Sequence, residues 1–194
     1  MSHYYSEEQD SEFKVIKIKD NIRSFDLEFF SAPGVFSKKK IDFGTKLLAE
    51  NMVVSKGDFV LDMGAGYGVI GIVAAKIGSK VILREINKRA CKLMEMNLEL
   101  NNVKAEIDQG NLYDGLKEKF NVIVSNVPQT AGKKICFEII EKSKGFLKKK
   151  GTLQIVARHN KGGKVLSEKM EEVFGNVRHI VKKRGYRVYA SIFN

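Results

Sequence analysis

The sequence contains few of the residues that build disulfide frameworks or metal centres. Its two cysteines, Cys91 and Cys136, lie far apart in stretches that we interpret as helices, and its three histidines are scattered without ligand spacing. This arrangement predicts neither a disulfide framework nor a bound metal. We expect both thiols to be buried, because free cysteine often behaves as a small apolar side chain.

Long apolar runs are also missing. The longest, Val69 to Ala75, is much shorter than the ~18 residues of a membrane-spanning helix, and the polar, acidic N-terminus does not resemble a signal peptide. We therefore expect a soluble, cytoplasmic protein without a membrane partner, either a monomer or a homodimer. With 194 residues, 43% of them apolar, the chain can form one domain over residues 1–194, with an arm and a β-hairpin appended in residues 1–30.

Acidic residues are scarce in the last third of the chain. From Lys133 to Asn194 there are sixteen Lys and Arg residues but only five Asp and Glu, so this segment carries the whole net charge of +11. A basic segment beside a neutral one indicates a polyanionic partner, RNA above all, although a lysine-rich solvated surface has the same composition.

The hydrophobic pattern predicts an N-terminal hairpin followed by alternating strands and helices. The hairpin strands are expected at 13–18 and 23–29, with a turn at Asp20 and Asn21 between them. A loop follows over 31–45, and a short helix over 46–52. Further strands are expected at 59–62, 80–83, 105–107, 120–125, 152–157, 177–181 and 186–192, and further helices at 68–77, 87–101, 133–147 and 162–174. This order predicts an α/β fold with a mostly parallel sheet that closes on an antiparallel pair.

A glycine-rich segment, LDMGAGYGVIG, stands where the first strand of this sheet meets its helix. Ligands bind at such strand ends, where glycines admit a close backbone approach. Gly64, Gly66 and Gly68 give the spacing G-x-G-x-G, whereas dinucleotide enzymes have G-x-G-x-x-G. The carboxylate of Asp62 would repel a pyrophosphate and attract the ammonium group of S-adenosylmethionine (SAM). The motif therefore favours SAM over NAD, with a structural turn as the other alternative.

Two polar residues follow the next strands of the predicted sheet. Glu85 ends the second strand, where a carboxylate can accept hydrogen bonds from ribose hydroxyls; the alternatives are a surface glutamate or a partner of Arg84. Asn111 follows the third strand, where an amide can contact the edge of adenine. It is also a common turn residue beside Gly110.

The fourth strand ends in SNVPQ, from Ser125 to Gln129. The side-chain oxygen of Asn126 and the carbonyl of Val127, held by the rigid Pro128, are two acceptors that can grip an exocyclic amino group. They would orient its lone pair for in-line methyl transfer without a strong base. A plain turn is one alternative, and a thiol nucleophile at Cys136 is another.

The ordered set GVFS (Gly34 to Ser37), DFGT (Asp42 to Thr45), LDMGAGYGVIG, EIN, NLY and NVP resembles the small-domain class I methyltransferases. These include guanine-N2 methyltransferases of small-subunit ribosomal RNA and archaeal relatives. The resemblance runs from about Tyr4 to the C-terminus. It implies a Rossmann-like fold with a seven-stranded sheet, one reversed strand at its edge, and SAM as cofactor. It also implies a target-amine site at Asn126, Val127 and Pro128.

The expected cofactor site combines a closing segment, the glycine loop and the ends of the next strands. It consists of Phe36, Thr45, Asp62, Gly64, Ala65, Gly66, Tyr67, Gly68, Glu85, Ile86, Asn111, Leu112 and Asn126. One departure from the family pattern concerns the acceptor: Gln129 stands where the family has an aromatic or aliphatic residue, so it offers no stacking surface for a base.

The resulting hypothesis is a SAM-dependent methyltransferase acting on a base of ribosomal or transfer RNA, most favourably guanine. The exocyclic nitrogen N2 is favoured as the methyl acceptor over a ring nitrogen. Aromatic candidates for stacking on a flipped base are Tyr4, Tyr5 and Phe36. Phosphate contacts are expected from Lys38, Lys39, Lys40, Lys133, Lys134, Arg158 and Lys161. The alternatives are a protein glutamine-N5 methyltransferase, which leaves the basic charge unexplained, and a non-catalytic SAM- or RNA-binding module.

Overall fold

The computed structural model describes residues 14–194, so the predicted strand start at Phe13 and the stacking candidates Tyr4 and Tyr5 lie outside the described residues. The described chain begins with an antiparallel hairpin of β1 (Ile16–Ile22) and β2 (Phe25–Ser31). Its turn is formed by Arg23 and Ser24, both with positive φ. The turn therefore comes later than the predicted one at Asp20 and Asn21, and strand β1 extends through those residues.

The central sheet has seven strands in the order β5-β4-β3-β6-β7-β9-β8. Their bounds are β3 (Phe59–Met63), β4 (Lys80–Glu85), β5 (Glu106–Gln109), β6 (Phe120–Asn126), β7 (Leu147–Arg158), β8 (Arg178–Lys183) and β9 (Tyr186–Ile192). Strands β3 to β7 are parallel, and β9 is antiparallel to both β7 and β8. The predicted fold is confirmed, but the reversed strand is not at the edge. Strand β9 forms hydrogen bonds with β7, and β8 is the edge strand on its other side.

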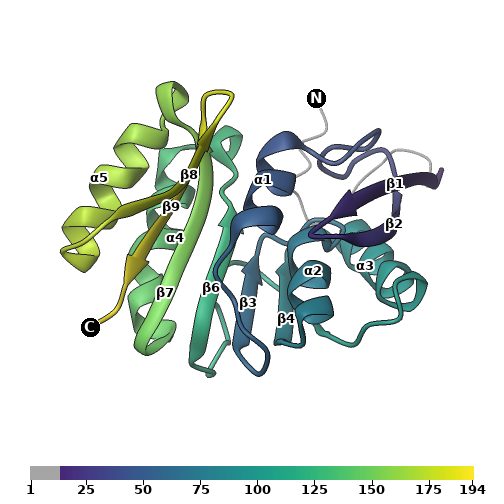
Figure 1. Cartoon of the computed structure of the whole chain (residues 1–194), viewed down its shortest axis with the longest axis horizontal. Coiled ribbons are helices and arrows are strands. Elements are labelled where there is room, and N and C mark those ends of the chain that lie inside the picture. The colour runs from purple at the N-terminus through teal and green to yellow at the C-terminus, as the bar shows by residue number, and fades with distance from the viewer. Residues whose placement is uncertain (1–13) are drawn as a thin grey trace.

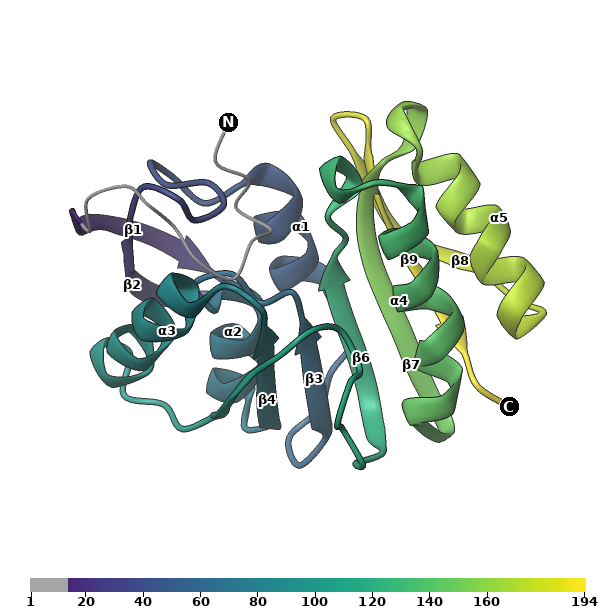
Figure 2. The ribbon, with the colours of Figure 1, turned by 180° about the vertical axis from the view of Figure 1, so that it is seen from behind.

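Helices cover both faces of this sheet (Figures 1 and 2). Helices α1 (Phe43–Asn51), α2 (Val69–Ile77) and α3 (Lys88–Leu100) share one hydrophobic core with the hairpin. Helices α4 (Lys133–Phe146) and α5 (Gly163–Phe174) form the second core on the opposite face. None of the helices in residues 14–194 is long and apolar enough to cross a membrane.

Two asparagines on one face of α3 anchor the hairpin to the domain. Asn97 accepts a hydrogen bond from the Phe30 amide at 2.6 Å and donates to the Phe30 carbonyl at 3.0 Å. Asn101 does the same with Glu28, at 3.2 and 2.7 Å. The two side chains thus satisfy the outer edge of β2 as a neighbouring strand would. The hairpin is held firmly, and so is the start of the loop that leads from β2 to the carboxyl edge of the central sheet.

Candidate functional site

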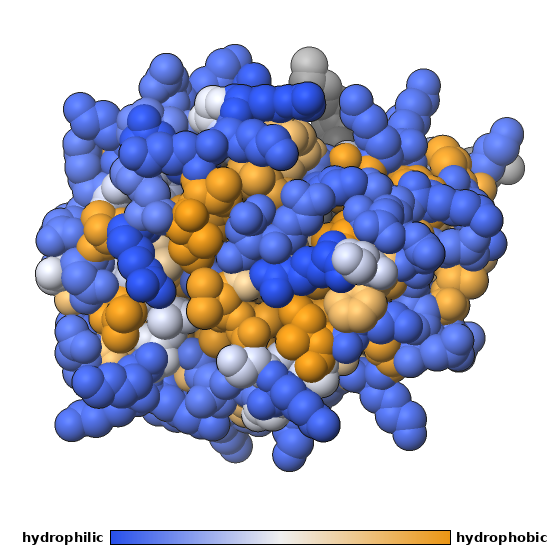
Figure 3. Space-filling model, viewed as in Figure 1, coloured by the Kyte–Doolittle hydropathy of each residue, from blue (hydrophilic) through white to orange (hydrophobic). Residues whose placement is uncertain are grey.

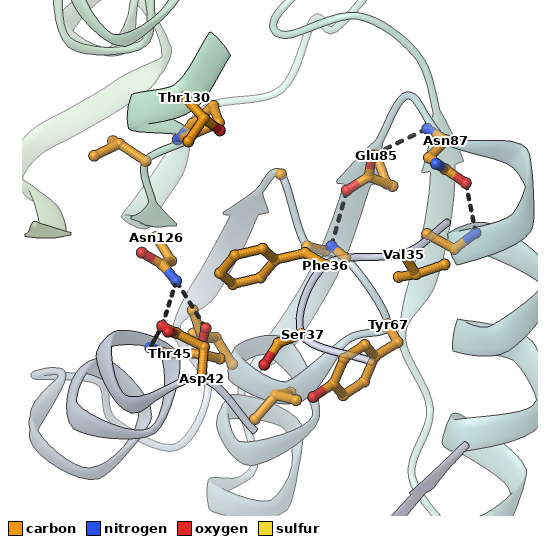
Figure 4. A pocket seen from close by; sticks show the side chains of 18 of the residues that line it. Val35, Phe36, Ser37, Asp42, Thr45, Tyr67, Glu85, Asn87, Asn126 and Thr130 are labelled. Carbon is orange, nitrogen blue, oxygen red and sulfur yellow. Dashed lines mark hydrogen bonds between the residues drawn. The ribbon is translucent and has the colours of Figure 1, made fainter. Parts of the chain in front are cut away.

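A pocket of about 250 Å³ lies at the carboxyl ends of the parallel strands. It sits where the strand order reverses, since β4 and β5 extend the sheet on one side of β3 and β6 lies on the other. Its walls come from the loop before α1, the glycine loop, and the ends of β4, β6 and β7, together with the start of β9. Figure 4 shows Phe36 of the first loop lying between Asn126 and Glu85.

The glycine loop turns its backbone toward this space. Gly64 and Gly66 have positive φ values of 72° and 58°, and a Cβ atom on either would meet nothing within 4 Å. The amides of Gly64 and Ala65 both donate to the carbonyl of Arg84, which ties the loop to β4. The loop therefore leaves room for a ligand to lie directly against the main chain.

Glu85 presents a fixed carboxylate at the end of β4. Its Oε2 accepts from the amide of Gly66 at 2.8 Å, and its Oε1 accepts from those of Ile86 and Asn87 at 2.9 and 3.0 Å. Burial raises the pKa of Glu85, and the three amides act in the opposite direction. The neighbouring Arg84 pairs with Asp108 instead, at 2.5 Å. Glu85 is thus a rigid acceptor in the pocket wall rather than a partner of Arg84.

Asn126 ends β6 and is held by the first turn of α1. Its Nδ2 donates to Oγ1 of Thr45 at 2.8 Å and to Oδ2 of Asp42 at 3.2 Å. Asp42 is also the N-cap of α1, since the same oxygen accepts from the Thr45 amide at 3.0 Å. Because a carboxylate only accepts, the amide nitrogen must face Asp42. The Asn126 oxygen consequently points away from both partners (Figure 4).

The next two residues form a tight turn. The Val127 carbonyl accepts from the Gln129 amide at 2.8 Å, and Pro128 has φ −76° and ψ 75°, the geometry of an inverse γ-turn. One lone pair of the predicted second acceptor is therefore engaged, which leaves the other for a ligand. The Gln129 side chain bonds to the amide of Arg158 and the carbonyl of Lys161, so it ties this turn to the end of β7.

Cys136 has the properties of a structural thiol. It is buried, its thiol donates to the Pro128 carbonyl at 3.6 Å, and burial raises its pKa to about 11. A thiol with such a pKa is almost entirely protonated at neutral pH and is a poor nucleophile. The geometry therefore argues against cysteine-based transfer and favours direct attack by the acceptor.

Asp62 does not line the pocket. It is completely buried, its Oδ2 accepts from the amide of Gly71 in α2 at 2.8 Å, and its Oδ1 has no partner among the described residues. The carboxylates that line the pocket are Asp42 and Glu85, and Arg158 is the one Lys or Arg that lines it within residues 14–194. This set of charges suits a cationic ligand such as SAM better than a pyrophosphate.

The buried position of Asp62 has a consequence for stability. Burial, reinforced by the charge of Glu85 and opposed by the Gly71 amide, raises the pKa of Asp62 to about 7 from 3.8. A carboxyl with a raised folded-state pKa stabilises the fold below its unfolded pKa, and this contribution is lost as the pH rises. We expect the free energy of unfolding of the unaltered protein to fall between pH 4 and 7 by about 3 kcal/mol more than that of the Asp62→Asn variant. Denaturant titrations at several pH values measure this difference; parallel profiles would contradict it.

Most of the remaining predicted cofactor residues line one of two cavities, and Gly68 and Asn111 line neither. Thr45, Ala65 and Tyr67 line the main pocket. Ile86 and Leu112 line a smaller adjoining cavity of about 20 Å³ that shares Gly64, Glu85 and Pro128 with it. Gly68 caps α2 in the left-handed conformation. Asn111 lies outside both cavities, exposed, with its Nδ2 3.4 Å from Oδ2 of Asp114.

The predicted RNA contacts all lie near the pocket end of the sheet and are exposed. Lys38, Lys39 and Lys40 precede α1, Lys133 and Lys134 begin α4, and Arg158 and Lys161 follow β7. Arg158 is the member of this set that lines the pocket. Within residues 14–194, no group of three or more His, Cys, Asp and Glu side chains could hold a metal ion.

Several pocket residues were not predicted, and two of them, Asp42 and Tyr186, contact predicted site residues. Asp42 belongs to the DFGT motif, and an Asp before a helix is a typical N-cap, which is a usable sequence signal. Tyr186 begins β9, and its ring lies 5.4 Å from that of Phe43 and 5.4 Å from the guanidinium of Arg158. Nothing in the local sequence places Tyr186 here, because its position depends on the pairing of β9 with β7.

This architecture defines a class: a doubly wound sheet whose switch-point pocket combines a glycine loop, a buried carboxylate and an Asn-x-Pro turn. The model of the methyltransferase small domain family matches residues 26–190. The chain therefore belongs to the methyltransferase small domain family, and SAM, the cofactor predicted from the sequence, agrees with this membership.

The chain is similar to several known proteins. It is 36% identical to the uncharacterized protein YbxB of Bacillus subtilis, over 96% of both chains. It is 30% identical to ribosomal RNA small subunit methyltransferase C of Colwellia psychrerythraea, over 89% of this chain and 49% of that one. The solved structure of the Thermus thermophilus enzyme RsmC, a 16S rRNA guanine-N2 methyltransferase in complex with AdoMet and guanosine, matches with a TM-score of 0.83. Its identity is 24%, over 95% of this chain and 51% of that one. The chain thus spans about half the length of these methyltransferase C relatives.

Proposed function

We propose that this protein is a SAM-dependent methyltransferase that transfers a methyl group to the exocyclic amino group of guanine in ribosomal RNA. The observation that carries this proposal is the fixed amide of Asn126, whose oxygen is turned away from Asp42 and Thr45 at a pocket bordered by Glu85 and the glycine loop. The methyltransferase C relatives support the same class of substrate.

The residues present fit SAM along the length of the pocket. Glu85 offers a carboxylate for the ribose hydroxyls. Gly64 and Gly66 leave open space above the loop. Asp42, at the other end, adds negative charge near the positively charged methionine portion. When bound, SAM supplies an electrophilic methyl group.

Asn126 is proposed to act on the acceptor. Its Oδ1 accepts a hydrogen bond from the amino group, which holds the nitrogen in place and favours the positive charge that develops there during transfer. The free lone pair of the Val127 carbonyl is a second acceptor for the same group. The described pocket contains no strong base. The nitrogen becomes positively charged as it gains the methyl group, so it is acidic enough to release its proton to solvent water.

The test is transfer of tritium from labelled SAM to small-subunit ribosomal RNA of a strain that lacks the gene, followed by nucleoside analysis. The proposal predicts label in N2-methylguanosine and none in RNA from the parent strain, where the site is already methylated. Label in another nucleoside would correct the target atom. Label in a protein, or binding of SAM without transfer to any RNA, would overturn the proposal.

A further inference from the structure

A group of basic side chains outside the predicted RNA contacts surrounds the turn between β8 and β9. Lys182, Lys183, Arg184 and Arg187, named here the hairpin cluster, lie within six consecutive residues, and the first three are exposed. Figure 3 shows hydrophilic side chains covering the top of the molecule, where Figure 1 places this turn. The turn sits at the pocket end of the sheet, because Tyr186 both begins β9 and lines the pocket.

The described part of the chain offers the hairpin cluster no acidic partner. None of the ion pairs found within residues 14–194 involves its members, whereas Lys164 and Lys169 on the neighbouring helix α5 pair with glutamates. Lys182 and Arg187 are cross-strand neighbours in the ladder of β8 and β9, as are Lys183 and Tyr186. Like charges held opposite each other are unfavourable unless a counter-charge neutralises them.

Two histidines lie close enough to these cations for their pKa values to be lowered by them. His159 follows β7 and His179 lies on β8, and both contact the ring of Tyr189. Desolvation lowers the pKa of each, and the charges of Lys182 and Arg187 lower it further, joined by Lys164 at His159. The charges of the cluster therefore act on groups at the end of β7 and on β8.

A stack of aromatic rings and guanidinium groups connects this turn to the pocket. The Arg184 guanidinium lies 5.3 Å from the centre of the Phe43 ring. The Phe43 ring packs on that of Tyr186, and the Tyr186 ring centre lies 5.4 Å from the Arg158 guanidinium. The His159 amide also donates to the carbonyl of Gly185 in the turn, at 2.9 Å. The cluster is thus held at a fixed position relative to the pocket mouth.

We propose that the hairpin cluster is a docking surface for the phosphate backbone of the RNA substrate, next to the nucleotide whose base enters the pocket. These four cations, which form no ion pair within residues 14–194, fit a row of phosphates beside the pocket mouth. Phosphates could neutralise them without first breaking an ion pair among those residues. The choice of RNA as partner rests on the proposed function. The surface itself rests on the charges and contacts described above.

The test compares two variants with equal loss of charge. One carries Lys182→Gln, Lys183→Gln and Arg187→Gln; Arg184 is left in place because it packs on Phe43. The control carries Lys148→Gln, Lys149→Gln and Lys150→Gln, three exposed lysines near the start of β7, at the opposite end of the sheet. Binding of a labelled fragment of small-subunit ribosomal RNA is measured from about 50 to about 200 mM salt, and SAM binding is measured alongside.

We expect the hairpin variant to bind this RNA at least about tenfold more weakly at low salt, with the slope of log affinity against log salt reduced by about 2. The RNA affinity of the control variant, and the SAM affinities of both variants, should match those of the unaltered protein. Equal losses in the two variants, or an unchanged slope in the hairpin variant, would overturn the docking surface. An unaltered protein that binds RNA as expected but transfers no methyl group would overturn the proposed function and leave the surface standing.

Discussion

Replacing Asn126 with alanine is expected to lower the rate of methyl transfer by about 10²–10³-fold, the usual effect of deleting one oriented polar group that acts on developing charge. The alanine removes the oxygen that we propose accepts from the target amine, while Glu85 and the glycine loop keep their hydrogen bonds. SAM affinity should therefore change by less than about threefold. Single-turnover transfer to RNA and calorimetric titration with SAM measure the two quantities separately.

Variants of Asp42 test whether the orientation of the Asn126 amide matters for the rate, because they leave Asn126 itself in place. Asp42→Ala removes both the helix cap and one of the two acceptors that fix the Asn126 nitrogen, so the amide can rotate. We expect a loss of transfer rate of about tenfold or more, with about 1 kcal/mol of stability lost with the cap. Asp42→Asn keeps a capping acceptor and should restore much of both. An unchanged rate in Asp42→Ala would argue against oriented binding by Asn126, as would full activity of Asn126→Ala.

The local motifs predicted the parts of this site that depend on neighbouring residues alone. A glycine loop after an apolar strand, a carboxylate ending the next strand and an Asn-x-Pro turn ending the fourth are each readable within a few residues. Parallel strands bring such ends to one edge, so Gly64, Glu85 and Asn126 meet although the sequence separates them widely. The seven predicted RNA contacts were chosen from the basic charge of their segments, and they also lie near this edge.

The direction of a side chain and the order of strands were harder to predict. Asp62 carries the expected charge, but the alternation of side chains along β3 turns it toward α2. The sequence does not indicate to which face of the sheet this side chain points. The pocket instead receives its second carboxylate from Asp42, brought in by the packing of α1 against β6 and β7. Tyr186 reaches the pocket, and the hairpin cluster reaches the pocket end of the sheet, only because β9 inserts between β7 and β8.

Glu85→Gln is the second replacement with a large expected effect. Both oxygens of Glu85 accept from backbone amides, Oε2 from Gly66 and Oε1 from Ile86 and Asn87. A glutamine of the same shape must turn its Nε2 donor toward one of these N–H groups, which leaves two buried donors facing each other at a cost of about 1–3 kcal/mol. The change therefore disturbs the glycine loop or the start of α3, and it also weakens the acceptor proposed for the ribose.

We expect SAM affinity of the folded variant to fall about tenfold to a hundredfold, which corresponds to the loss of about 1.4–2.8 kcal/mol. The affinity of this variant for adenosine, which has the ribose but no methionine portion, should fall by the same factor. Asn126→Ala should leave the affinity for adenosine unchanged. Glu106→Gln, at an exposed glutamate on the neighbouring strand β5, is the matched control. Titration calorimetry at a temperature where circular dichroism shows each variant folded makes the comparison. A folded Glu85→Gln protein that binds SAM and adenosine as well as the control would place the ribose elsewhere, and the carboxylate would then serve only to fix the loop.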